Sequence, residues 1–124
     1  MQAFYDNEPS KLEAVGNGSF LYRYNIAEVE VESEEPRTQW QCDEVTVWSP
    51  VTRDVMTRVV INETWSKNYE QKLVNEYNGA LLGVYGAKTS AAAKEKIANY
   101  TAFLKQREAL KSTIDADCDE LHIK

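Results

Sequence analysis

The side chains that could act as a nucleophile or a general base are few. His122 is the single histidine, and it lies close to the carboxyl end of the sequence. Chain ends fray, and they hold a catalytic base poorly within hydrogen-bond reach of a substrate. A Ser-His-Asp or Cys-His arrangement would have to use this residue. We therefore predict a protein that is not an enzyme.

Metal and cofactor sites are not predicted either. Cys42 and Cys118 are the only cysteines, whereas a structural zinc site needs about four ligands at close spacing. We expect two reduced thiols, with one long-range disulfide open if folding brings them together. Residues 115–120 begin like a calcium loop, but position 6 is Glu120 where glycine is required, so we expect a solvated acidic helix end. The five glycines fit neither a dinucleotide loop nor a P-loop.

Charge argues against a nucleic-acid-binding domain. The 124 residues carry 14 Lys and Arg against 20 Asp and Glu, a net charge of -6. The acidity belongs to residues 1–50, with ten acidic and three basic side chains, mainly in a run of glutamates: Glu28, Glu30, Glu32, Glu34 and Glu35. This run is either a solvated strand face or an acidic docking surface for a basic partner.

Aromatic side chains are abundant, with three tryptophans and seven tyrosines. Tyr22, Tyr24, Trp40 and Trp48 lie in the strand region. Tyr and Trp are enriched at protein interfaces because they bury area at low entropic cost, but they are also ordinary core residues. The sequence leaves both alternatives open.

The first part of the chain has the two-residue period of β-strands. Residues 18–33 alternate, with a break in phase near Ile26 that indicates a bulge. Asn17-Gly18 predicts a hairpin turn to a short strand at 11–15, residues 34–37 predict a turn, and 38–48 predict another strand.

The helical period begins near Pro50. Ser49 as N-cap and Pro50 as the first helical residue predict a helix that ends at Trp65 against the sheet. Its apolar stripe comprises Val51, Val55 and Val59, with Met56 and Val60 beside them. A second helix is predicted at about 66–78, with Gly79 ending it.

The last helix begins at Thr89 or Ser90 and is long. Its predicted stripe has three- and four-residue spacing and comprises Ile97, Tyr100, Leu104, Arg107, Lys111, Ile114, Cys118 and Leu121, with Phe103 and Leu110 widening the face. It either packs across its own domain or projects and self-associates, although two charged positions depart from a coiled-coil seam.

These elements predict an α+β fold: a small antiparallel β-part of two to four strands at 1–49, then three helices at 50–124, in one domain. We expect no membrane span and no secretion signal, and therefore a location in a virion or a bacterial host cytoplasm.

Four segments together carry a resemblance: residues 12–26, 42–48, 69–78 and 100–110. They resemble small uncharacterised proteins of phages and prophages of gut bacteria. The layout of a short β-part followed by a helical tail is also similar to tail-associated or tail-fibre-assembly proteins. The resemblance implies a virion component or assembly factor that acts by binding; it assigns no functional residue.

We therefore predict a structural or protein-interaction protein, whose partners are copies of itself or other virion proteins. The alternative is an acidic inhibitor or host-takeover protein that binds a basic surface, and an enzyme with an unrecognised site ranks third. The candidate interaction surface comprises residues of the strands and of the last helix: Tyr22, Tyr24, Glu28, Glu30, Glu32, Trp40, Trp48, Tyr100, Leu104, Arg107 and Ile114.

Overall fold

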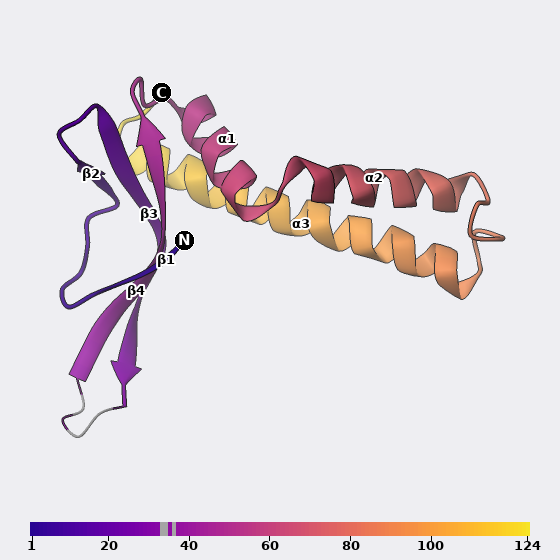
Figure 1. The fold of residues 1–124 in the computed structure, drawn as a ribbon, viewed down its shortest axis with the longest axis horizontal. Coiled ribbons are helices and arrows are strands. Elements are labelled where there is room, and N and C mark those ends of the chain that lie inside the picture. Colours follow the sequence, from indigo (N-terminus) through magenta and orange to yellow (C-terminus); the bar gives the residue numbers. More distant parts are fainter. Residues whose placement is uncertain (33–34, 36) are drawn as a thin grey trace. The chain divides into compact units, whose positions relative to one another are not determined.

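The computed structural model describes residues 1–32, 35 and 37–124. Its strands form one antiparallel sheet in the order β1-β4-β3-β2, with bounds β1 (Gln2–Tyr5), β2 (Leu12–Ala14), β3 (Ser19–Val31) and β4 (Arg37–Trp48). Three helices follow: α1 (Arg53–Thr64), α2 (Lys67–Leu81) and α3 (Ala91–Glu120) (Figure 1). The predicted α+β class, with strands first and a long last helix, is confirmed.

The chain divides into two compact units. The sheet unit comprises residues 1–63 and 113–124, and the hairpin unit comprises residues 64–112, so α3 contributes to both. Strands do give way to helices near Pro50, as predicted, but α1 groups with the sheet. The expectation of a single domain stays a prediction.

Pairing of β3 with β4 determines the sheet. Ser19 pairs with Trp48, and the register then shifts between Tyr24 and Ala27, where Asn25 has a φ of 53°. This is the predicted bulge. The turn at Asn17-Gly18 also forms, since Asn17 Oδ1 accepts the Ser19 N–H at 3.1 Å. Two residues of the turn predicted at 34–37, Glu34 and Pro36, lie outside the described residues.

Strand β1 was missing from the sequence prediction. Its four residues pair with β4, from Gln2 opposite Asp43 to Tyr5 opposite Trp40. A segment this short shows no clear two-residue period, so pairing with β4 rather than local pattern makes it a strand.

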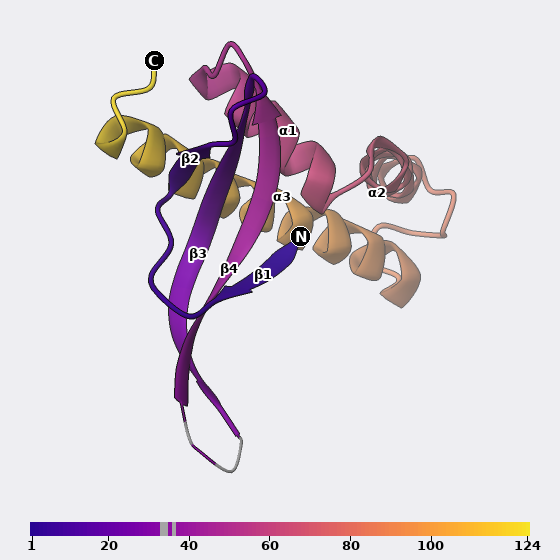
Figure 2. The ribbon, with the colours of Figure 1, turned by 60° about the vertical axis from the view of Figure 1, so that its left-hand side comes forward.

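One face of the sheet lies under α1 and the last turns of α3 (Figure 2). Tyr22 of β3 and Val47 of β4 are fully buried there, together with Met56 of α1 and Ile114 of α3. Cys118 Sγ lies 3.9 Å from Met56 Sδ. These side chains form the core of the sheet unit.

The start of α1 differs from the prediction. The Ser49 N–H still bonds to the Gly18 carbonyl at 3.0 Å, so the strand ladder continues past Trp48. The helix begins only at Arg53, and Thr52 Oγ1 accepts the Val55 N–H at 3.2 Å as the N-cap. Ser49 and Pro50 therefore precede the helix. Met56 and Val60, predicted beside the valine stripe, are buried together with Ile61, whereas Val55 and Val59 of the stripe itself are half-buried.

Serine caps begin both helices of the hairpin unit. Ser66 Oγ accepts the Tyr69 N–H at 3.1 Å, and Ser90 Oγ accepts the Ala93 N–H at 3.2 Å. The predicted end of α2 at Gly79 is wrong, because the helix continues to Leu81. A Cβ at Gly79 would lie 3.0 Å from Tyr85 Cε2, so glycine is needed for close approach of that ring.

Most of the predicted face of α3 is packed, with buried or half-buried side chains at Ile97, Tyr100, Arg107, Ile114, Cys118 and Leu121. Phe103 is buried, whereas Leu104 and Lys111 are exposed. In the hairpin unit Trp65 packs edge-to-face on Phe103, with ring centroids 5.3 Å apart, and Tyr77 stacks on Tyr100 at 4.9 Å. The predicted contact of Trp65 with the sheet is therefore replaced by a contact with α3.

This packing predicts unequal effects of two truncations on α3. Ile114 is 0% exposed, whereas Leu104 is 44% exposed. We expect Ile114→Ala to lower the free energy of unfolding by about 2–5 kcal/mol and Leu104→Ala by less than about 1 kcal/mol, measured by urea denaturation. Equal losses would contradict the assigned packed face.

Candidate functional site

The register places most of the predicted strand residues on one face of the sheet. Side chains alternate along a strand, so positions 40, 44 and 48 of β4 share the face opposite Tyr22. Beyond the bulge, Glu28 pairs with Trp40, which brings Glu28, Glu30 and Glu32 to the same side. We call this side, opposite α1 and α3, the open sheet face (Figure 2).

The open sheet face combines acidic and aromatic side chains. Glu28, Glu30 and Glu32 are exposed, and Trp48 is 59% exposed. Val15, next to the strand pair of Ser19 and Trp48, is also exposed. Trp48 pairs with Ser19 at one end of the β3–β4 ladder, and Glu28 pairs with Trp40 towards the other, roughly 26 Å away along an extended strand. The face therefore offers an exposed ring at one end and carboxylates at the other, and both suit contact with a basic protein surface.

A buried arginine lies at the centre of this face. The Arg23 side chain is 3% exposed, and its Nε donates to Glu44 Oε2 at 2.9 Å. Its Nη2 donates to Glu13 Oε1 at 2.7 Å, and its Nη1 donates to the Ser10 carbonyl at 3.1 Å. The guanidinium also lies 4.7 Å from the centre of the Tyr5 ring. The segment between β1 and β2 thus closes over Arg23.

Electrostatic interactions in this cluster favour the charged forms of Glu44 and Arg23. Burial by itself would raise the pKa of Glu44, but the hydrogen bonds from Tyr5 and Arg23 and the nearby guanidinium together lower it. The same carboxylate raises the pKa of Tyr5, with burial adding to it. Glu44 therefore stays ionised as the main counter-charge of Arg23, and the cluster is a structural ion pair.

A second polar network lies on the helix side of the sheet. The Tyr22 hydroxyl donates to Asp117 Oδ2 at 2.5 Å, and Lys11 Nζ donates to Asp117 Oδ1 at 3.0 Å. Lys11 also pairs with Glu120. Arg53 Nη2 donates to Asp119 at 2.5 Å. The acidic end of α3 is thus neutralised by two cations, so the expectation of a solvated helix end is wrong for the buried Asp117.

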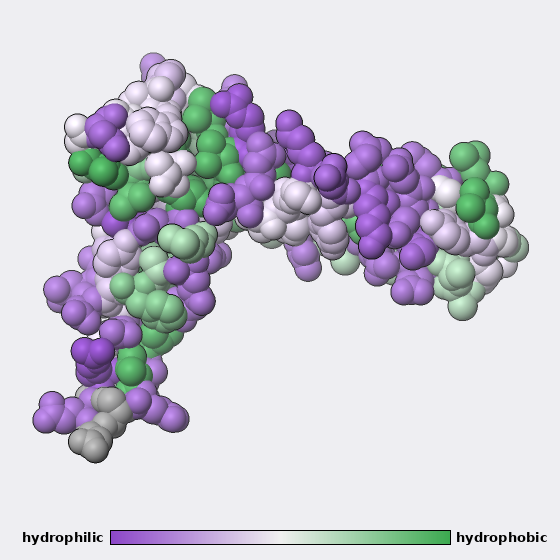
Figure 3. All heavy atoms as spheres, in the orientation of Figure 1, coloured by the Kyte–Doolittle hydropathy of each residue, from purple (hydrophilic) through white to green (hydrophobic). Residues whose placement is uncertain are grey.

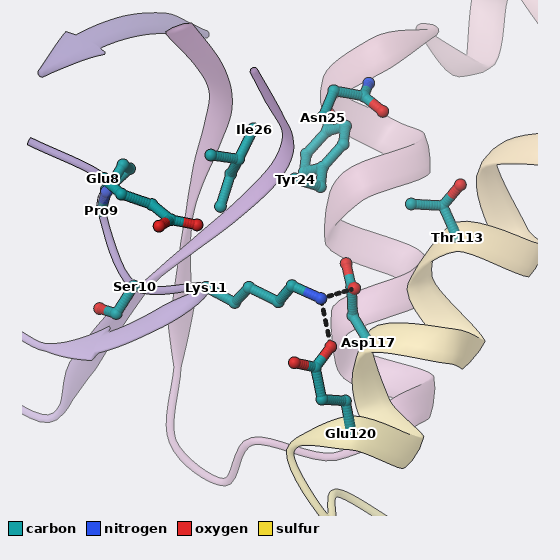
Figure 4. A pocket seen from close by; sticks show the side chains of 10 residues that line it. All are labelled: Glu8, Pro9, Ser10, Lys11, Tyr24, Asn25, Ile26, Thr113, Asp117 and Glu120. Carbon is teal, nitrogen blue, oxygen red and sulfur yellow. Dashed lines mark hydrogen bonds and ion pairs between the residues drawn. The ribbon is translucent and has the colours of Figure 1, made fainter. Parts of the chain in front are cut away.

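A hollow of about 610 Å³ lies beside this network (Figure 4). Its walls come from the segment before β2, the bulge of β3 and the end of α3: Glu8, Pro9, Ser10, Lys11, Tyr24, Asn25, Ile26, Thr113, Asp117 and Glu120. The Lys11 side chain runs along it to the two carboxylates of α3. These charges pair with one another and tie the β1–β2 connection to α3.

The buried groups of the sheet unit are held in their protonated forms. Burial, and then the bond to Asp117, raise the pKa of Tyr22 far above its ordinary value, so the phenol stays a donor. Burial likewise raises the pKa of the Cys42 and Cys118 thiols, both of which are free. Neither thiol is activated as a thiolate.

The other predicted surface residues separate into two groups. Tyr22, Tyr24 and Ile114 are buried in the core, so their assignment to a contact surface is corrected. The aromatic residues before the bulge alternate onto the packed face, which the sequence left open. In the hairpin unit Tyr100 stacks on Tyr77, Leu104 is exposed, and Arg107 is half-buried.

Sequence reasoning missed two features. The Arg23 cluster joins residues from β1, β2, β3 and β4, and only the fold brings them together. A lone arginine in an otherwise aromatic strand segment was the available signal. The exposed apolar turn at Leu82 and Val84 was also missed, because its glycines indicated only a loop or a ragged helix.

Comparisons with known proteins do not assign the chain to a family. No family model matches the chain, and neither a curated protein nor a solved structure is significantly similar to it. Within the part of the chain that the structure describes, no helix combines the length and apolarity needed to cross a membrane. The same residues contain no group of three or more His, Cys, Asp or Glu side chains placed to hold a metal ion.

The Arg23–Glu44 pair predicts a pH-dependent stability difference. Because folding lowers the pKa of Glu44, this group stabilises the fold above its unfolded pKa, and the contribution is lost as the pH falls. We expect Glu44→Gln to lower the free energy of unfolding by about 1–3 kcal/mol at pH 7. The gap to the unmodified chain should narrow between about pH 5 and pH 3.

Urea denaturation at several pH values measures this gap. Glu28→Gln, which removes an exposed carboxylate from the paired strand β3, is the matched control and should change stability by less than about 0.5 kcal/mol. A gap for Glu44→Gln that is independent of pH would show that its ion pair does not stabilise the fold.

Proposed function

We propose that this chain acts by binding another protein through its open sheet face, as a structural or assembly component rather than as a catalyst. The observation that carries the proposal is that this face exposes Glu28, Glu30 and Glu32 around the half-buried Trp40, and exposes Trp48 at the other end of β4. The partner surface it fits is basic, with an apolar spot for the exposed Trp48 ring.

The rigidity of the open sheet face supports a role in protein binding. Arg23 and its partners fix β1, β2, β3 and β4 to one another at the centre of this face, between Trp48 and the glutamates of β3. A surface held rigidly by buried ion pairs loses little conformational entropy when it binds. Its aromatic side chains therefore suit a lasting contact.

We further propose a virion component or an assembly factor as the class of protein. The resemblance of four segments to phage and prophage proteins supports this class, as does the layout of a sheet followed by a long helix.

An acidic inhibitor of a basic host protein is the second candidate. The sheet unit favours it, since residues 1–63 and 113–124 carry 16 acidic and six basic side chains, a net charge of -10. Ionic strength separates the candidates: a contact made mainly by charge weakens strongly between about 50 and 500 mM salt, whereas one that buries Trp48 persists.

Site-specific photo-crosslinking tests the proposed function in the cells that naturally express the chain. A photoreactive amino acid in place of Trp48 should yield discrete protein adducts. Glu28→Gln, Glu30→Gln and Glu32→Gln together should reduce the adduct yield about tenfold, because the charges orient the partner. The same amino acid at the exposed Asn68 of α2 is the control.

Adducts that are absent at position 48, or equal at positions 48 and 68, would contradict the proposal. The identity of the adduct distinguishes its two forms. A structural protein of a particle supports the assembly role, and a basic host enzyme supports the inhibitor.

A further inference from the structure

The turn between α2 and α3 is held by hydrogen bonds and leaves two apolar side chains exposed to solvent. Gly83 and Gly86 have φ values of +82° and +90°, and Val84 N–H bonds to the Gly79 carbonyl at 2.9 Å. Ser90 Oγ donates to the Tyr85 carbonyl at 3.0 Å. Within this frame the Tyr85 ring turns inward over Gly79 and lies 5.6 Å from Lys96 Nζ.

Leu82 and Val84 turn outward from the same frame. They are 81% and 72% exposed, more than the other exposed apolar residues of the hairpin unit. Figure 3 shows hydrophobic atoms gathered at this end of the hairpin unit, next to a largely hydrophilic helical surface. A hydrogen-bonded turn that half-buries Tyr85 yet exposes Leu82 and Val84 is typical of a binding surface. We call these two residues the hairpin tip.

Charge indicates what the hairpin tip binds. Residues 64–112 carry eight basic and four acidic side chains, a net charge of +4, with Lys88 in the turn itself. The sheet unit has a net charge of -10 and exposes Trp48 and Val15 beside the carboxylate of Glu13. The two units of one chain are therefore complementary in charge, and each offers exposed apolar side chains.

We propose that the hairpin tip of one copy docks on the open sheet face of a second copy, with Leu82 and Val84 against Trp48. This inference rests on the proposed function and names the partner of the open sheet face. Because the two surfaces differ, the contact is heterologous, and its repetition gives a closed ring or an open filament.

Light scattering on a size-exclusion column, across a tenfold concentration range, tests the proposal on the purified full chain. The unmodified chain should form assemblies larger than its 14.2 kDa monomer, and these should weaken as salt rises. The variant Leu82→Glu with Val84→Glu should weaken association by roughly 30-fold or more, since it removes the apolar anchors and adds repelling charge.

Two controls make this loss specific. Leu104→Gln changes another exposed leucine of the hairpin unit and should leave assembly unchanged. Trp48→Lys removes the receiving side chain and should abolish assembly as the tip variant does. Circular dichroism should show that all variants fold, because each altered side chain is exposed.

Mixing the two defective variants is the decisive step. The tip variant keeps an intact sheet face, and Trp48→Lys keeps an intact tip, so a mixture restores one contact and gives a 1:1 dimer that grows no further. A mixture that stays monomeric, or a tip variant that assembles like the unmodified chain, would overturn the proposal.

The remaining outcomes separate this proposal from the proposed function. An unmodified chain that is monomeric at every concentration overturns self-docking, while adducts from position 48 to a different protein keep the binding role. If the monomer instead sediments with phosphatidylserine vesicles through Leu82 and Val84, the tip binds lipid and self-docking is also overturned.

Discussion

Pairing between β3 and β4 decides which side chains lie under the helices and which face away from them. Tyr22 is opposite Val45 on the packed side, and Arg23 is opposite Glu44 on the other. The bulge at Asn25 then resets the alternation, so that Glu28 and not Ala27 joins the open sheet face. A shift of the register by one residue would exchange the two sets, placing carboxylates against the core.

Two polar networks hold this register from opposite sides of the sheet. Arg23 is bonded to residues of three other strands and of the β1–β2 connection, and loss of Glu44 would leave its charge buried with fewer partners. On the packed side, Tyr22 and Lys11 converge on Asp117 of α3. Buried polar groups of this kind are costly when misaligned, and they therefore favour one arrangement of strands and helix over its alternatives.

Much of the fold was predictable because it depends on local pattern. The alternation of residues 18–31, the turn at Asn17-Gly18 and the serine caps at 66 and 90 all act within a few residues of one another. The predictions failed where contacts between residues that are far apart in the sequence determine the structure. Strand β1 exists through its pairing with β4, and α1 begins only at Arg53 because the strand ladder continues past Trp48 to Ser49.

The candidate site was predicted in part for the same reason. Exposed glutamates and Trp48 follow from strand alternation, but the burial of Tyr22 and Tyr24 depends on which face α1 and α3 cover. The Arg23 cluster and the hairpin tip depend on loop paths that no short motif encodes. A sequence can therefore indicate that a surface is aromatic and acidic before it indicates which aromatic residues remain on it.

Hydroxyl-radical footprinting of the full chain, read residue by residue at low and high concentration, tests the central claim most directly. At low concentration Trp48 and Leu82 should be oxidised readily, while Tyr22 is protected. At high concentration Trp48 and Leu82 should become protected together. Oxidation of Tyr22 as fast as Trp48 at low concentration would contradict the assigned sheet faces, and protection that never reaches Trp48 would contradict its role in self-docking.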